Sequence, residues 1–304
     1  MKRRNFIKNS IYSSLLLSGS ALNFNSCMAS EQKKITILHT NDVHSHIEPF
    51  NENHAKFPNK GGVARRSTII ESIKSSNPNT LLLDAGDIFQ GTPYFNYYGG
   101  EIEFKLMSML NYDAATIGNH DFDNGIEGLY AQLPNAKFQF ISSNYDFRNT
   151  IMDSHAKTYM IFNKSDIKIG VFGLGIELKG LVNNNLYKET KYLDPIEITQ
   201  EMAKKLKEKE KCDLIICLSH LGHSYKDNSK KISDITLAKS TKNIDLIIGG
   251  HTHTFLDRPE IVTNIDGEKV IINQVGCFGL YLGQIDFYFD SMKNKTSNAY
   301  AIEV

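Results

Sequence analysis

The stretch IDLIIGGHTHTF, residues 244–255, joins an apolar run to two glycines and then to two histidines spaced one residue apart. The run Ile244–Ile248 is typical of a strand buried in a sheet, but a buried strand does not require that ending. Imidazole side chains are common metal ligands in proteins. The stretch therefore predicts a strand that delivers two metal ligands, His251 and His253, to the edge of a sheet.

Four further apolar runs end in a polar cluster of the same kind. The clusters are Asn41-Asp42-Val43-His44 after Ile35–Leu38, Gly86-Asp87 after Thr80–Leu83, Gly118-Asn119-His120-Asp121-Phe122-Asp123 after Ala114–Ile117, and Ser219-His220 after Leu214–Leu218. Taken singly, Gly-Asp is usually a turn, and a histidine after a strand is more often a surface or core residue. In α/β sheets, however, ligand sites lie beyond the carboxyl ends of the strands. Five such clusters in order favour convergence on one crevice.

Short β-rich runs alternate with helical segments along the whole chain, which predicts an α/β fold with large sheets. Further expected strands are Phe138–Ile141, Ile167–Phe172, Val270–Val275 and Gly283–Phe289. One helix is expected to start at Asp194-Pro195, since Asp is a good cap and Pro a good first residue, and another to span Glu101–Leu110. We expect residues 31–304 to form one domain.

The composition is that of a soluble globular protein, with 41% apolar and 22% charged residues. Residues 1–30 hold four of the 34 basic residues and no acidic one, so 30 basic residues face 34 acidic ones beyond them, a net charge of −4. A weakly acidic chain is not drawn to nucleic acid polymers or to anionic membranes. Affinity for a phosphate group must therefore come from a local site.

Residues 1–30 resemble a bacterial export signal, because a basic start precedes a short apolar core. The run Arg3-Arg4-Asn5-Phe6-Ile7-Lys8 resembles a twin-arginine signal, with an ordinary export signal as the alternative. Cys27 stands where a lipoprotein cysteine would be, although Phe24-Asn25-Ser26 matches the usual motif poorly. We expect an exported protein, either periplasmic or anchored to the membrane only through a lipid on Cys27.

The ligand types in the five clusters favour a centre of two metal ions. Seven candidate ligands are too many for one tetrahedral site, and mixed carboxylate, amide and imidazole donors suit Zn, Mn, Fe or Co. A bridging carboxylate allows two ions to lie about 3.5–4 Å apart, a spacing that supports in-line displacement at phosphorus. Such ions polarise phosphoryl oxygens and generate hydroxide at neutral pH.

The five clusters resemble the signature of the calcineurin-like metallophosphoesterases, over nearly all of residues 35–290. Finer features resemble the 5′-nucleotidase branch: Leu38-His39-Thr40-Asn41-Asp42-Val43-His44, Gly61-Gly62-Val63-Ala64-Arg65, Gln90-Gly91-Thr92-Pro93-Tyr94 and Asn119-His120-Asp121-Phe122-Asp123. The resemblance implies a four-layer α/β/β/α sandwich of two mixed sheets with helices outside.

The resemblance also implies a role for each site residue. Asp87 would bridge two ions, one held by Asp42, His44 and His253, the other by Asn119, His220 and His251. His120 would face the phosphate, stabilising the transition state or protonating the leaving oxygen, and Asp123 would orient His120.

The expected activity is dimetal hydrolysis of phosphate esters, as a 5′-nucleotidase or a related nucleotide phosphohydrolase. Typical members of this branch continue into a domain that grips the nucleoside, whereas this sequence stops at Val304. The chain could be a phosphoesterase of loose specificity, or a catalytic subunit served by a separate nucleoside-binding chain. Two alternatives are a thiosulfohydrolase-like dimetal hydrolase and a non-catalytic metal-binding scaffold. All seven ligand positions and the His120–Asp123 pair are present, which disfavours the scaffold.

Overall fold

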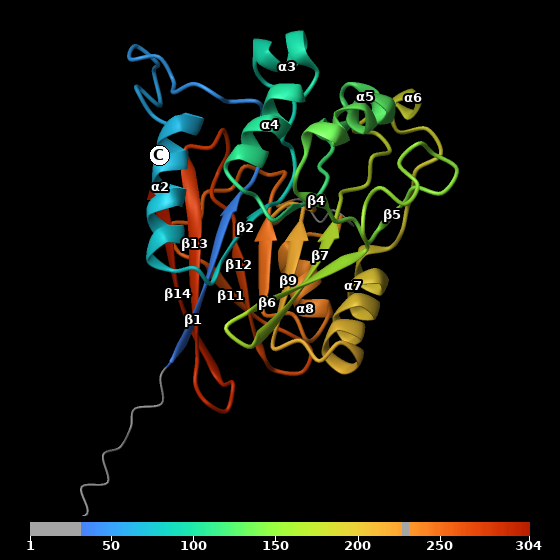
Figure 1. Cartoon of the computed structure of the whole chain (residues 1–304). Helices are drawn as coiled ribbons and strands as arrows, with labels where there is room; N and C mark the ends of the chain where they lie inside the picture. Colours follow the sequence, from blue (N-terminus) through green and yellow to red (C-terminus); the bar gives the residue numbers. More distant parts are fainter. Residues whose placement is uncertain (1–31, 227–230) are drawn as a thin grey trace, which may run out of the picture. The chain divides into compact units, whose positions relative to one another are not determined.

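Two six-stranded sheets face each other in the computed structural model, which describes residues 32–226 and 231–304 (Figure 1). Residues Gln32–Val304 form one compact unit. The predicted export signal and Cys27 lie outside the described residues. Among the described helices, none has the length and apolar character to cross a lipid bilayer.

The first sheet is mixed and has the strand order β14-β13-β1-β2-β3-β4. Strands β1 to β4 run parallel, and β13 and β14 run antiparallel to their neighbours. The strands are β1 (Lys33–Thr40), β2 (Thr80–Asp84), β3 (Ala114–Ala115), β4 (Gln139–Phe140), β13 (Tyr281–Phe289) and β14 (Lys295–Glu303).

The second sheet is also mixed, with the order β11-β12-β10-β9-β7-β6. Its four central strands are parallel, and β6 and β11 are antiparallel edges. The strands are β6 (Tyr159–Lys164), β7 (Ile167–Leu174), β9 (Leu214–Ser219), β10 (Leu246–Gly249), β11 (Glu260–Thr263) and β12 (Lys269–Asn273). A separate two-stranded sheet pairs β5 (Tyr145–Asp146) with β8 (Lys191–Tyr192).

Helices cover the outer face of each sheet, and the alternation of side chains along the strands explains how. Ile37 points into the core between the sheets, whereas its neighbour Leu38 packs on the helical side, because successive residues of a strand face opposite ways. The first sheet packs on α2 (Val63–Ser76), α4 (Glu101–Met109) and α5 (Gly125–Gln132), and the second on α7 (Pro195–Lys204) and α8 (Asp234–Ser240). The predicted α/β/β/α sandwich is confirmed.

The shorter helical segments lie in the connections. They are α3 (Pro93–Tyr98), α6 (Asn184–Tyr187), two 3₁₀ turns, η1 (His120–Phe122) and η2 (Leu133–Asn135), and a π-helical turn, η3 (Lys205–Lys209), that continues α7.

Capping chemistry places the start of α7 where the sequence predicts it. The Asp194 carboxylate accepts hydrogen bonds from the N–H groups of Ile196 and Glu197, at 2.8 and 2.9 Å. Met202 and Leu206 then recur on the buried face of this segment. The helix predicted from Glu101 is confirmed as α4.

Three edge strands, β6, β11 and β14, were not predicted from the sequence. The clearest case is β14, whose residues Lys295–Glu303 are mostly polar and exposed. This segment has no apolar pattern that would predict a strand, and it becomes a strand only because it pairs with β13. The predicted strands Ala114–Ile117 and Phe138–Ile141 are shorter than expected, since β3 and β4 have two residues each.

Candidate metal centre

Five loops that leave the carboxyl ends of strands meet at one edge of the two sheets. They follow β1, β2 and β3 in the first sheet and β9 and β10 in the second, and the arrowheads of the parallel strands point to this side in Figure 1. Two of the contacts that join the sheets here show how closely the loops meet. The His251 N–H donates to Asp42 Oδ1 over 2.8 Å, and His220 Nδ1 lies 2.7 Å from the carbonyl oxygen of Ala85. The polar ends of distant strands therefore share one site.

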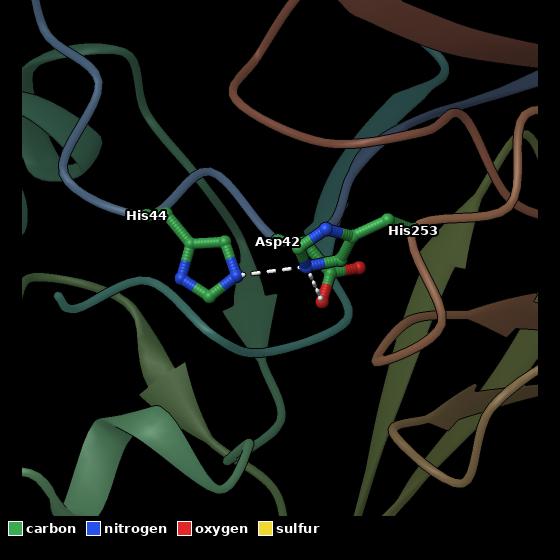
Figure 2. Close-up of side chains that lie close together, drawn as sticks. All are labelled: Asp42, His44 and His253. Carbon is green, nitrogen blue, oxygen red and sulfur yellow. Dashed lines mark hydrogen bonds and ion pairs between the residues drawn. The ribbon is translucent and has the colours of Figure 1, made fainter. Parts of the chain in front are cut away.

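Asp42, His44 and His253 form a first group, called the open cluster below. Their possible ligand atoms all lie within 4.8 Å of one another. The two Nε2 atoms of His44 and His253 are 3.0 Å apart, and His253 Nε2 lies 3.6 Å from Asp42 Oδ1. Figure 2 shows the two rings and the carboxylate converging on one point. Three donors that face a common centre can hold a metal ion.

Asp87, His220 and His251 form a second group, the buried cluster, whose ligand atoms also lie within 4.8 Å of one another. His220 Nε2 is 3.0 Å from Asp87 Oδ2. The side-chain oxygen of Asn119 lies 2.8 Å from His251 Nδ1, which brings this amide to the same place. Asp87 Oδ2 is also 3.8 Å from His44 Nε2, so the Asp87 carboxylate lies between the two clusters.

A comparison with known protein families agrees with this geometry. The family model described as calcineurin-like phosphoesterase matches residues 35–255, a range that holds all residues of both clusters. The chain belongs to the calcineurin-like phosphoesterase family. Members of this family use a dimetal centre, and the two clusters are two groups that could each hold an ion.

Relatives of this chain cover it almost from end to end. It is 37% identical over 278 residues to the snake venom 5′-nucleotidase of Naja atra, covering 84% of this chain and 50% of the relative. It is 36% identical over 293 residues to the 5′-nucleotidase of Homo sapiens, covering 87% and 48%. The 5′-nucleotidase precursor from Thermus thermophilus has a similar structure, with a TM-score of 0.80, 30% identity, and coverage of 90% of this chain and 55% of that one. The chain spans about half the length of the curated relatives it matches.

The backbone of this phosphoesterase site takes a conformation that side-chain-bearing residues rarely adopt. Left-handed φ angles occur at five of the candidate ligands: Asp42 (49°), His44 (50°), Asp87 (56°), His251 (69°) and His253 (51°). Such conformations persist only where the surroundings enforce them, and they gather at functional sites.

Burial prepares the imidazoles of the phosphoesterase site for metal binding. It lowers the pKa of His44 and of His251 to about 4, so both rings are neutral at pH 7 and present a lone pair. Burial acts to raise the pKa of the Asp87 carboxyl, but the charge and hydrogen bond of His220, together with His44 and His120, outweigh burial and hold this pKa below its usual range. Among the described residues, the buried His220 Nε2 forms no well-aligned hydrogen bond, although Asp87 Oδ2 lies 3.0 Å from it. A buried nitrogen without such a bond, among carboxylate and amide oxygens, fits a divalent ion.

His120 and Asp123 lie beside the open cluster and outside both groups. His120 Nδ1 is 2.8 Å from Asp123 Oδ2, and the His120 ring centre is 5.2 Å from that of His44. The hydrogen bond with Asp123 raises the pKa of His120 above its usual value. Because Nδ1 is engaged, Nε2 is the nitrogen available to a substrate, and the His120 side chain is 38% exposed.

Two polar residues outside the expected ligand set, Asn41 and Gln274, support the ligands. The amide of Asn41 donates to Asp42 Oδ2 over 2.7 Å, and its oxygen accepts from the Val275 N–H at 3.0 Å. Gln274 donates from Nε2 to the Gly250 carbonyl oxygen over 2.7 Å, next to His251. Asn41 directly precedes the candidate ligand Asp42, so its place in the sequence could have indicated a supporting role. Gln274 follows an ordinary strand and carries no local signal.

Proposed function

We propose that this chain hydrolyses phosphate esters with two divalent metal ions, as a 5′-nucleotidase or a related nucleotide phosphohydrolase. The observation that carries the proposal is the position of the Asp87 carboxylate, 3.0 Å from His220 Nε2 and 3.8 Å from His44 Nε2. One carboxylate in reach of two clusters is what a pair of close ions requires. The names of the relatives support the nucleotide as the substrate.

In this proposal the open and buried clusters each hold one ion, and the metals are Zn, Mn, Fe or Co. Asp42, His44 and His253 would hold one ion, Asn119, His220 and His251 would hold the other, and Asp87 would serve both. When bound, the ions would polarise the phosphoryl group and activate water for attack on phosphorus. The neutral state of His44 and His251 supports this assignment, because only a neutral imidazole can coordinate. Burial lowers the pKa of His220, but the Asp87 and Asp42 carboxylates raise it to about 10, so His220 would give up its proton when an ion binds.

His120 is proposed to act on the phosphate from outside the metal ligands. Its raised pKa keeps the ring protonated to a higher pH, so Nε2 can donate a proton to the leaving oxygen. Asp123 fixes the ring through Nδ1 and stabilises its protonated form. The partial exposure of the His120 side chain leaves room for a substrate to reach it.

Export is proposed on the basic and apolar pattern of residues 1–30, with Cys27 as a possible site of lipid attachment. Cell fractionation tests the lipid attachment directly. If Cys27 carries a lipid, the wild type should fractionate with the membrane and Cys27→Ser should not.

The test of function is a hydrolysis assay on the purified chain, stripped of metal and resupplied with Mn, Zn or Co. The substrates are nucleoside 5′-monophosphates, a 2′,3′-cyclic nucleotide, a nucleotide sugar and a simple aryl phosphate. We expect metal-dependent phosphate release, with base preference only if this chain recognises the nucleoside itself. Activity confined to the aryl phosphate would support a separate nucleoside-binding chain. No activity with any metal would contradict the proposal and favour the alternative of a thiosulfohydrolase-like hydrolase.

A further inference from the structure

The buried carboxylate of Asp121 accepts hydrogen bonds from four backbone N–H groups and from no side chain of the described residues. Oδ2 accepts from Asp87 at 3.1 Å and Gly118 at 2.8 Å, and Oδ1 accepts from Ile88 at 2.9 Å and Phe89 at 3.1 Å. The residue has no exposed surface. Asp121 belongs to neither metal cluster, so metal binding does not explain why this carboxylate is buried. Bonds from backbone N–H groups to a carboxylate are among the stronger hydrogen bonds in proteins.

The contact between the two loops is reciprocal. Asp121 binds the N–H of Asp87, and Asp87 Oδ1 in turn accepts from the N–H of His120 over 2.8 Å. The loops are also pressed together, because a Cβ atom added to Gly118 would lie 2.2 Å from Asp87 Oδ1. These contacts therefore fix the position of the 86–89 loop relative to the 118–121 loop.

The same 86–89 loop sets the position of a third loop through its carbonyl groups. Three N–H groups of the loop after β1 donate to three successive carbonyl oxygens of the 86–89 loop. The pairs are Asp42 to Gly86 at 3.0 Å, His44 to Asp87 at 3.1 Å and Ser45 to Ile88 at 2.9 Å. The N–H side of the 86–89 loop is thus held by Asp121, and its carbonyl side holds the loop of the open cluster.

We propose that Asp121 is a positioning residue that aligns both metal clusters by clamping the 86–89 loop in its left-handed conformation. The inference rests on the proposed dimetal function. Asp87 has a φ angle of 56°, which costs free energy unless neighbouring contacts enforce it. Three consecutive N–H groups, those of residues 87–89, converge on the Asp121 carboxylate and enforce the turn. Neither the bridging carboxylate nor the open cluster would then hold its geometry without Asp121.

The test is Asp121→Asn, whose side chain has nearly the same shape but only one accepting oxygen. The NH₂ group of Asn would face two N–H donors and leave them unpaired. Calorimetric titration of the metal-free protein with Mn²⁺ should show an affinity about 10–100-fold weaker than that of the wild type. In the two-Mn form, electron paramagnetic resonance should show weaker coupling between the ions, and kcat for an aryl phosphate should fall with little change in KM.

The matched control is Asp113→Asn, at the opposite end of the same sheet. The Asp113 carboxylate also accepts from a backbone N–H, that of Leu82 at 2.8 Å, but has no link to the clusters. This variant should lose stability while Mn²⁺ affinity and coupling stay at the wild-type values. If Asp121→Asn bound both ions as the wild type does, or if Asp113→Asn lost affinity equally, the clamp would be disproved.

Two further results separate this inference from the proposed function. A wild-type chain that binds two ions without hydrolysing phosphate esters would contradict the function, while the Mn²⁺ titration would still decide the role of Asp121. If Asp121→Asn does not fold, hydrogen exchange of the wild-type chain decides instead. The Ile88 and Phe89 amides should exchange slowly although they lie outside helices and strands. Exchange at the rate of an open loop would overturn the clamp.

Discussion

The open cluster and the buried cluster lie side by side but differ in how far water reaches them. In the open cluster the His253 side chain is 38% exposed, whereas His220 in the buried cluster has no exposed surface. The difference comes from the chain: His220 directly follows β9 and is sealed against the carbonyl oxygen of Ala85, while His253 lies further out on the loop after β10. The Asp87 carboxylate therefore lies between two groups whose histidines differ in exposure.

This difference indicates which side of the centre meets a substrate. His120 lies against the open cluster, at 5.2 Å from the His44 ring, and is itself partly exposed. The buried cluster has no comparable opening at His220 or Asp87. Under the proposed function, a phosphate ester would therefore reach His253 of the open cluster and the nearby His120 more easily than His220 of the buried cluster.

Replacing Asp87 should have the largest effect, because it removes what the two clusters share. Asp87→Ala is expected to lower the metal content from two ions per chain and to bring phosphate release below detection. Metal analysis after gel filtration, together with the phosphate assay, checks this. A variant that kept two ions and wild-type turnover would show that the clusters do not depend on a common carboxylate.

The comparison of His220→Ala with His253→Ala tests the difference in burial itself. His220→Ala leaves the buried Asp87 without its partner and should lower the free energy of unfolding by about 3–5 kcal/mol. His253→Ala removes a partly exposed ring and should cost about 1 kcal/mol or less, while the buried ion remains bound. Thermal unfolding and metal analysis of both variants decide the matter. Equal losses in the two variants would contradict the distinction between an open and a buried cluster.

His120→Ala should separate catalysis from metal binding. Loss of a general acid is expected to lower kcat by about 10²–10⁴-fold. Since His120 belongs to neither cluster, the metal content should stay at the wild-type value. His155→Ala, at an exposed histidine away from the clusters, serves as the control. Unchanged kcat in His120→Ala would refute its role at the phosphate.

The smallest expected effect is a shift in pH dependence on replacing Asp123. The hydrogen bond with Asp123 raises the pKa of His120, so the protonated acid persists to higher pH and activity declines as pH rises through that pKa. In Asp123→Asn the pKa of His120 should fall, and the basic limb of the kcat profile should move to lower pH. Profiles measured with saturating metal test this. A basic limb that stayed in place would mean that another group controls it.

Local patterns in the sequence were enough to predict an α/β fold with large sheets and to name the residues that the site brings together, whereas the four-layer sandwich followed from the resemblance to the calcineurin-like metallophosphoesterases. The reason is that each pattern lies within one short segment of the chain. An apolar run predicts a buried strand, and the residues that follow it carry the polar side chains of the site. The start of α7 was predictable for the same reason, since Asp194 caps N–H groups two and three residues away. The edge strand β14 was not predictable, because a polar segment takes its strand form from β13.

What the sequence by itself determined is therefore the set of strand ends and their polar side chains. Tertiary structure alone decided that Asp42 and His251, 209 positions apart, would touch, and that His220 would be fully buried while His253 stays partly exposed. It also decided the role of Asp121, which holds four backbone N–H groups. Every residue except proline carries such a group, so no residue type in the sequence marks which of them a buried carboxylate will bind.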